Sequence, residues 1–126
     1  MNESPLLLRQ INPTFIQNGH AHYIAFRPTK KDEKRLSVSD GNKISAQAAW
    51  ERYTETLGYQ SCGVLGVTIS ESETTGLPVC EAPVDGQPDH MVIDFSHLDS
   101  RGKVDHAAKA LCHFATVRDW LYKKPS

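Results

Sequence analysis

The stretch CGVLGVTI, residues 62–69, decides the fold, because it carries no charged residue and is rich in valine. A β-strand that is buried on both faces has this composition, since neither face is in contact with water. We therefore predict a central strand here. LLLRQI at 6–11 and HMVIDF at 90–95 are largely apolar runs of strand length, and each predicts a further strand.

Two long helices are predicted along the chain. Residues 46–57 follow the capping residue Ser45 and end before Gly58, and their apolar side chains recur at helical spacing. Residues 104–117 show the same spacing. A capping-box spacing that begins at Ser70 predicts a brief third helix.

The remaining strands are short, and they are predicted at 22–26, 36–38, 77–82 and 120–122. Pro78 places its strand at a sheet edge, because proline lacks the amide that an inner strand needs. Most strands follow one another directly instead of alternating with helices. The predicted fold class is therefore α+β, a mixed and mostly antiparallel sheet with two main helices packed on one face. Residues 1–126 are expected to form one domain, frayed at about 1–5 and 123–126.

The composition is that of a small, nearly neutral globular protein. Its 126 residues include 14 lysines and arginines against 15 acidic residues, which gives a formal net charge of -1. A chain without a positive excess lacks the attraction on which non-specific nucleic-acid binding relies. Three cysteines without a CxxC pair, and no leader segment, predict a cytoplasmic protein in a reducing compartment.

Histidines form the first candidate site. His20 and His22 stand two residues apart and would point to one face of a strand. His90 and Asp94 share a face of another predicted strand, so neighbouring strands would let the four side chains bind zinc or iron. The same residues also suit the polar face of a sheet, and this interpretation is preferred. No cofactor is therefore predicted, with a divalent metal as the alternative.

Arg9 and Ser37 form the second candidate site. An arginine and a serine on strands resemble those of some ADP-ribosyltransferases, which also need a late catalytic glutamate. Glu81 is the one late glutamate of this chain. The alternative is that Arg9 is an ordinary strand residue paired with an acid. Cys62 is a nucleophile only if a histidine reaches it, and a buried strand cysteine is the preferred interpretation.

The charged segment 27–35 is the candidate interaction surface. It begins with Arg27, and its densest cationic group is Lys30, Lys31, Lys34 and Arg35. Two acidic residues inside the segment offset part of this charge. Charged loops and unpaired strand edges are natural docking surfaces, so this segment and the edge strand at 77–82 are expected to contact a partner.

The segments LLRQINPTFI, AFRPTKKDEKRLSVSDG, GVLGVTI and GLPVCEAPVDGQPDHMVIDF occur in this order between Leu7 and Phe95. In this layout the chain resembles a widespread group of short uncharacterised bacterial proteins. The resemblance implies a bacterial or phage-island origin and an accessory role beside a larger enzyme or a defence or toxin system. It supplies no catalytic residues.

Two functions of different classes follow. The preferred one is a small, non-catalytic, cytoplasmic interaction protein that is the accessory or regulatory partner of another protein, encoded nearby. The alternative is a small enzyme or ligand-binding domain in which the histidines act with or without a metal, and Arg9 and Ser37 hold an anionic group. Membranes and nucleic acid are not expected partners, and self-association stays open.

Overall fold

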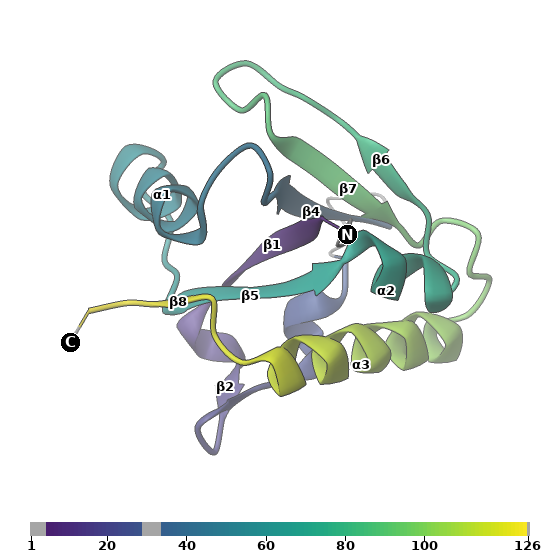
Figure 1. Cartoon of the computed structure of the whole chain (residues 1–126). Helices are drawn as coiled ribbons and strands as arrows, with labels where there is room; N and C mark the ends of the chain where they lie inside the picture. Colours follow the sequence, from purple (N-terminus) through teal and green to yellow (C-terminus); the bar gives the residue numbers. More distant parts are fainter. Residues whose placement is uncertain (1–4, 29–33, 126) are drawn as a thin grey trace.

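A computed structural model describes residues 5–28 and 34–125 of the chain, and these residues form two sheets (Figure 1). The larger sheet has six strands in the order β6-β7-β4-β1-β5-β8, and every neighbouring pair is antiparallel. Its strands are β1 (Leu6–Ile11), β4 (Arg35–Asp40), β5 (Gly63–Thr68), β6 (Val79–Glu81), β7 (His90–Asp94) and β8 (Tyr122–Lys123). The smaller sheet pairs β2 (Ile16–Gln17) with β3 (His20–Ala21).

Helical segments connect these strands. They are the 3-10 helices η1 (Pro13–Phe15) and η2 (Tyr23–Phe26), the α-helices α1 (Ala46–Glu51), α2 (Ile69–Thr74) and α3 (Arg101–Arg118), and the π-helical turn η4 (Arg52–Thr56) that continues α1. The α+β class and the mostly antiparallel sheet are confirmed. No helix in the described part of the chain is long and apolar enough to cross a membrane.

The two main helices lie on opposite faces of the large sheet, whereas the sequence analysis placed both on one face (Figure 1). Leu7 on β1 belongs to the core beneath α3, and its neighbour Leu8 packs with Ala49 of α1. Successive strand residues point to opposite faces, so both faces of β1 and β5 must be apolar. This double burial explains why the stretch at 62–69 carries no charge.

Three predictions about helices need correction: one predicted strand is a helix, and two helices have other bounds or another form than predicted. The strand predicted at 22–26 is the helix η2, because the Nδ1 atom of His22 accepts a hydrogen bond from the amide of Ile24 (3.2 Å) and starts a helical turn. The brief helix α2 begins after Thr68 instead of Ser70, and Thr68 forms a complete capping box with Glu71. The helix predicted at 46–57 ends as the π-helical turn.

Residues near the chain ends that were expected to fray make backbone hydrogen bonds. The carbonyl of Pro5 accepts from the amide of Ile69 (3.0 Å), and the amide of Lys124 donates to the carbonyl of Cys62 (2.9 Å). Residues 1–4 and 126 lie outside the described residues. The sheet therefore extends to both described ends of the chain.

The large sheet opens between β1 and β4. β1 pairs with β5 along six residues, but it pairs with β4 only through Leu7 and Leu8. From Arg9 onward the two strands diverge (Figure 1), and the guanidinium of Arg9 spans the gap. Its Nε atom donates to the carbonyl of Ala25 (2.8 Å), and an Nη atom donates to the carbonyl of Ser37 (3.0 Å). Two cavities that Arg9 lines lie on either side of this opening.

Candidate functional site: two cavities that share Arg9

The four residues predicted to share a metal ion do not come together. His20 lies on β3 of the small sheet, and His90 and Asp94 lie on β7 of the large sheet. His22 caps η2 instead of lying on a strand beside His20. Within residues 5–28 and 34–125, no group of three or more histidine, cysteine, aspartate or glutamate side chains is arranged to hold a metal ion.

Asp94 and His90 have local hydrogen-bond partners instead. Asp94 accepts a hydrogen bond from the amide of Ser96 (2.8 Å), and bonding to Ser96 lowers the pKa of the Asp94 carboxyl below its ordinary value. The Nδ1 atom of His90 lies 2.7 Å from the carbonyl oxygen of Ala82. Because a carbonyl oxygen can only accept, this ring nitrogen carries the proton.

The three residues of the ADP-ribosyltransferase hypothesis do not all lie in one cavity. Arg9 and Ser37 line one cavity, and His90 lines it with them. Glu81 lies on the edge strand β6, with an exposed side chain 3.7 Å from the amine of Lys43. The structure thus joins the arginine and the serine to a histidine, and it leaves the glutamate outside this cavity.

Cys62 has the environment of a structural cysteine. Its thiol lies 3.3 Å from the carbonyl oxygen of Ile11, to which it donates. Burial raises the pKa of the Cys62 thiol above its ordinary value. A nucleophilic cysteine needs the opposite shift, because the thiolate is the reactive form.

The predicted interaction surface is described only in part. Lys30 and Lys31 lie outside the described residues. Arg35 begins β4 opposite Asp94 of β7. Lys34 precedes it with a left-handed backbone (φ 66°), and its amine lies 3.4 Å from the carbonyl oxygen of Leu98. Lys34 is therefore held where it lines the larger of the two cavities.

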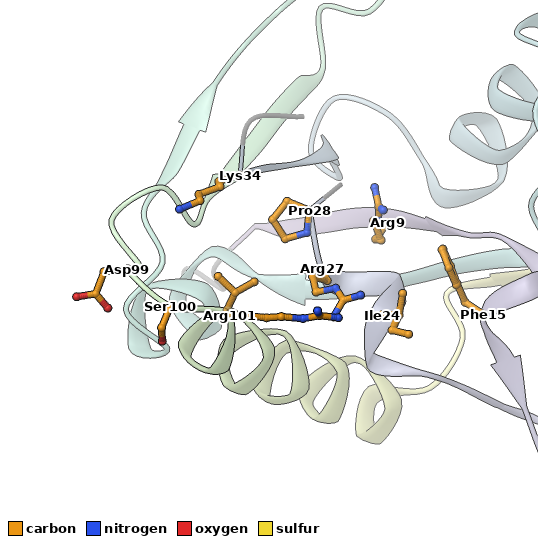
Figure 2. Close-up of a pocket in the computed structure, with 10 residues that line it drawn as sticks. Arg9, Phe15, Ile24, Arg27, Pro28, Lys34, Asp99, Ser100 and Arg101 are labelled. Atoms are coloured by element: carbon orange, nitrogen blue, oxygen red, sulfur yellow. The ribbon is translucent and has the colours of Figure 1, made fainter. Parts of the chain in front are cut away.

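The larger cavity, here called the cationic cleft, has a volume of about 750 Å³ and opens on the α3 side of the sheet (Figure 2). Its lining residues are Arg9, Phe15, Ile24, Arg27, Pro28, Lys34, Asp99, Ser100, Arg101 and Val104. Four of these side chains are cationic and one is a carboxylate. Figure 2 shows Lys34 and Asp99 at one end of the cleft and Phe15 at the other.

Hydrogen bonds fix two of the cations of this cleft, Arg9 and Arg27. Arg9 is held by the two carbonyls described above. Arg27 donates to the carboxylate of Asp105 on α3 (2.9 Å), and both side chains are about one quarter exposed. Asp99 accepts from the amine of Lys103 one helical turn later (2.8 Å). Cations held in this way lose little conformational freedom when a ligand binds.

The cleft has no arrangement for nucleophilic or acid–base chemistry among its described lining residues. The hydroxyl of Ser100 accepts a hydrogen bond from the amide of Lys103 and so caps α3. The carboxylate of Asp99 pairs with the side chain of Lys103. A nucleophile needs a base within hydrogen-bond reach, and neither side chain has one. The lining of the cleft thus combines charged and apolar surface.

The smaller cavity, here called the polar pocket, has a volume of about 200 Å³ and lies on the α1 side of the sheet. Its lining residues are Leu8, Arg9, Gln10, Asn12, Phe15, Ser37, Val38, Ser39, Tyr53, Gln87 and His90. Apart from Arg9, its polar groups are hydroxyls, amides and one imidazole. Burial raises the pKa of the Tyr53 phenol, and the positive charge of Arg9 opposes that rise.

Sequence reasoning found Arg9, Ser37, Lys34 and His90, and it included Arg27 in the charged segment 27–35. It missed Arg101 and Tyr53 as parts of these cavities. The signal for Arg9 was a charge inside an apolar strand, where burial requires partners. Arg101 begins a helix whose own sequence gives no sign of a cavity. Tyr53 fits the apolar spacing of its helix, and that spacing does not distinguish a cavity wall from the core.

Comparison with protein-family models, with curated proteins and with solved structures finds no match for this chain. The function is therefore argued from the two cavities.

Proposed function

We propose that this chain is a small, non-catalytic interaction protein that binds an acidic segment of a partner protein in the cationic cleft. The observation that carries the proposal is the combination of four cationic side chains with an apolar wall in one cavity of about 750 Å³. Binding cavities in proteins commonly measure roughly 300–1,000 Å³ and join apolar walls to a few fixed polar groups.

The lining of the cleft indicates what kind of partner segment it would bind. Phe15, Ile24 and Val104 supply apolar surface for at least one large apolar side chain of the partner. Arg9 and Lys34 lie at different places along the cleft (Figure 2), so carboxylates spaced along an extended peptide would meet them in turn. Arginine favours carboxylates because its planar donors match the two carboxylate oxygens.

The rest of the chain agrees with this assignment. Cys62, Cys80 and Cys112 are unpaired cysteines, which supports a reducing compartment such as the cytoplasm. An accessory partner of a larger bacterial protein would have these properties.

The test is a charge reversal with a matched control. Lys34→Glu with Arg101→Glu reverses two cations of the cleft, and both side chains are exposed enough to leave folding intact. Lys123→Glu with Lys124→Glu changes the net charge equally at the chain end. Fluorescence anisotropy measures binding of labelled peptides in which glutamates flank one leucine, beside peptides with glutamine in place of glutamate.

We expect the acidic peptides to bind the native protein and the chain-end variant alike, and to bind the cleft variant at least tenfold more weakly. The affinity should fall as salt concentration rises, because the contacts are charged. Equal binding of the glutamine peptides would overturn the proposal. So would equal affinity of the cleft and chain-end variants.

A further inference from the structure

The charges in and next to the polar pocket are matched within the chain. The guanidinium of Arg9 donates to the two backbone carbonyls described above. Arg52 donates two hydrogen bonds to the carboxylate of Asp89, at 2.7 and 2.8 Å. The carboxylate of Asp40, which directly follows a lining serine, accepts from the amide of Asn42 (2.8 Å). These two arginines and two aspartates carry no net charge together, so the pocket favours an uncharged ligand.

Two departures from regular secondary structure meet at this pocket. In one wall, the β1–β4 ladder ends at Leu8, so the next residues of the register, Gln10 and Ser37, are not paired with each other. The other wall is the π-helical turn η4, which carries Tyr53. Isolated π-helical turns are frequent at functional sites, and an interrupted ladder gives up backbone hydrogen bonds. Their coincidence at one cavity points to a binding site.

Four polar groups of the pocket lining have no hydrogen-bond partner within the described part of the chain. They are the hydroxyls of Ser37 and Tyr53, the side-chain amide of Gln87, and the Nε2 atom of His90. Ser37 and His90 alternate with the buried residues of β4 and β7, so both lie on the sheet face that η4 covers. These groups are therefore available to a ligand, unlike the donors of Arg9.

The tautomer of His90 determines what the ligand must offer. Its Nδ1 atom carries the proton and donates to the carbonyl of Ala82, so the neutral ring accepts at Nε2. The hydroxyls of Ser37 and Tyr53 can donate. The pocket thus presents an acceptor for a ligand N–H together with donors for ligand carbonyl oxygens. A cyclic imide, in which a ring N–H stands between two carbonyls, has the complementary pattern.

We propose that the polar pocket binds a small, uncharged cyclic imide, of the kind that the pyrimidine base uracil presents. The volume of about 200 Å³ equals roughly seven water molecules at liquid density, which suits a single ring with its carbonyl oxygens. Phe15 and Tyr53 supply aromatic surface against which a flat ring can pack. This site is separate from the cationic cleft and does not depend on the function proposed for it.

Nuclear magnetic resonance titration of the full chain tests the site. Uracil is the probe, and 1,3-dimethyluracil is the control that keeps the ring but lacks its N–H groups. Orotate adds a carboxylate to the same ring, and a short single-stranded oligouridine carries the ring in a nucleic acid. We expect saturable shifts of the Tyr53 and His90 ring signals with uracil, at a dissociation constant on the order of 1 mM. The other three compounds should bind more weakly.

Three variants assign the binding to the pocket. Ser37→Ala and Tyr53→Phe each remove one hydroxyl, and His90→Asn removes Nε2 but keeps an amide that can donate to Ala82. Each should weaken uracil binding about threefold to tenfold, the usual effect of losing one hydrogen bond. Tyr59→Phe is the matched control, because the Tyr59 ring packs beside Tyr53 (5.1 Å between ring centres) but does not line the pocket.

Several outcomes overturn the proposal. They are shifts that do not saturate, equal binding of dimethyluracil, tighter binding of orotate or of the oligonucleotide, or native affinity in all three pocket variants. The Lys34→Glu, Arg101→Glu variant should bind uracil as the native protein does, which separates this result from the peptide experiment. Because the three variants change different elements, folding failure in one leaves the others as the test.

Discussion

The cationic cleft and the polar pocket share Arg9 and Phe15, yet they are chemically different cavities. The cleft is several times larger, and it joins apolar surface to four cations. The pocket is small, and its described lining residues add only neutral polar groups to Arg9. One guanidinium, placed where β1 leaves β4, thus faces two different environments.

The difference shows how a cation's surroundings select its ligand. In the cleft, several charges and an apolar wall favour a long, multiply charged ligand. In the pocket, hydroxyls, amides and an imidazole surround the same guanidinium. Both cavities exist because the β1–β4 pairing stops after two residue pairs, which leaves a gap in the sheet. A complete β-ladder would have sealed the sheet between them.

Removing the ion pair beside the polar pocket should have the largest effect. Asp89→Asn breaks the paired bonds to Arg52, and the Asp89 side chain is only 3% exposed. Breaking a buried pair leaves an unmatched charge, so we expect a loss of about 2–4 kcal/mol in the free energy of unfolding, measured by urea denaturation. Peptide binding in the cleft should stay unchanged.

Glu81→Gln is the matched control for this variant, because Glu81 forms an exposed pair with Lys43 and its side chain is 69% exposed. Exposed pairs contribute little, so its unfolding free energy should stay within about 0.5 kcal/mol of the native value. Equal destabilisation by both variants would show that the buried pair has no special role in the wall of the pocket.

Arg9→Lys should have an intermediate effect and should reach both cavities. Lysine keeps the charge, but its single amine cannot reproduce the fixed donors that bond the carbonyls of Ala25 and Ser37. One lost hydrogen bond to a part-buried carbonyl predicts a loss of about 1–2 kcal/mol in stability.

Titration with the acidic peptide provides the measurement for this second variant, and we expect weaker binding. Native peptide affinity in Arg9→Lys would mean that Arg9 does not serve the cleft. Lys123→Glu is a suitable control, since Lys123 lies on β8 and is not among the lining residues of the cleft.

The sequence was sufficient for much of the fold, because the elements depend on local patterns. The apolar run at 62–69 gave β5, Pro78 placed β6 at the edge, and the spacing of apolar residues gave α3. The two faces of the sheet were harder to assign. Both Leu7 and Leu8 are apolar, so the pattern of β1 cannot say which helix covers which face.

The cavities were less predictable, because their residues come from segments far apart in the chain. Arg9 and Arg101 line the same cavity only because α3 packs against the sheet, and no local pattern reports that arrangement. The helix η2 was missed for a similar reason. Its residues have strand propensity, but the contact of Ala25 with Arg9 and the packing of η2 on α3 favour the helical turn.

Acid should lower the stability of the fold, because it weakens the ion pair in the wall of the polar pocket. Down to about pH 4, this loss should be the smallest of the three expected effects. The hydrogen bonds from Arg52 hold the pKa of Asp89 below its ordinary value. Burial alone would raise the pKa of Glu71, but bonds from Arg118 and from Thr68 outweigh it and lower that pKa also. A carboxyl with a lowered folded-state pKa stabilises the fold above its unfolded-state pKa, and this contribution is lost as pH falls through the folded value.

Stability should therefore be nearly constant from pH 7 to about 5 and decline below about 4.5, where unfolded carboxyls begin to bind protons. Urea denaturation across this range measures the decline in the native protein, in Asp89→Asn and in Glu71→Gln. Each variant lacks one of the two carboxyls, so each should decline less steeply than the native protein. Parallel curves for the native protein and Asp89→Asn would mean that the Arg52 pair contributes no acid-sensitive stability. The rigid wall of the polar pocket would then have to come from the packing around Tyr53 instead.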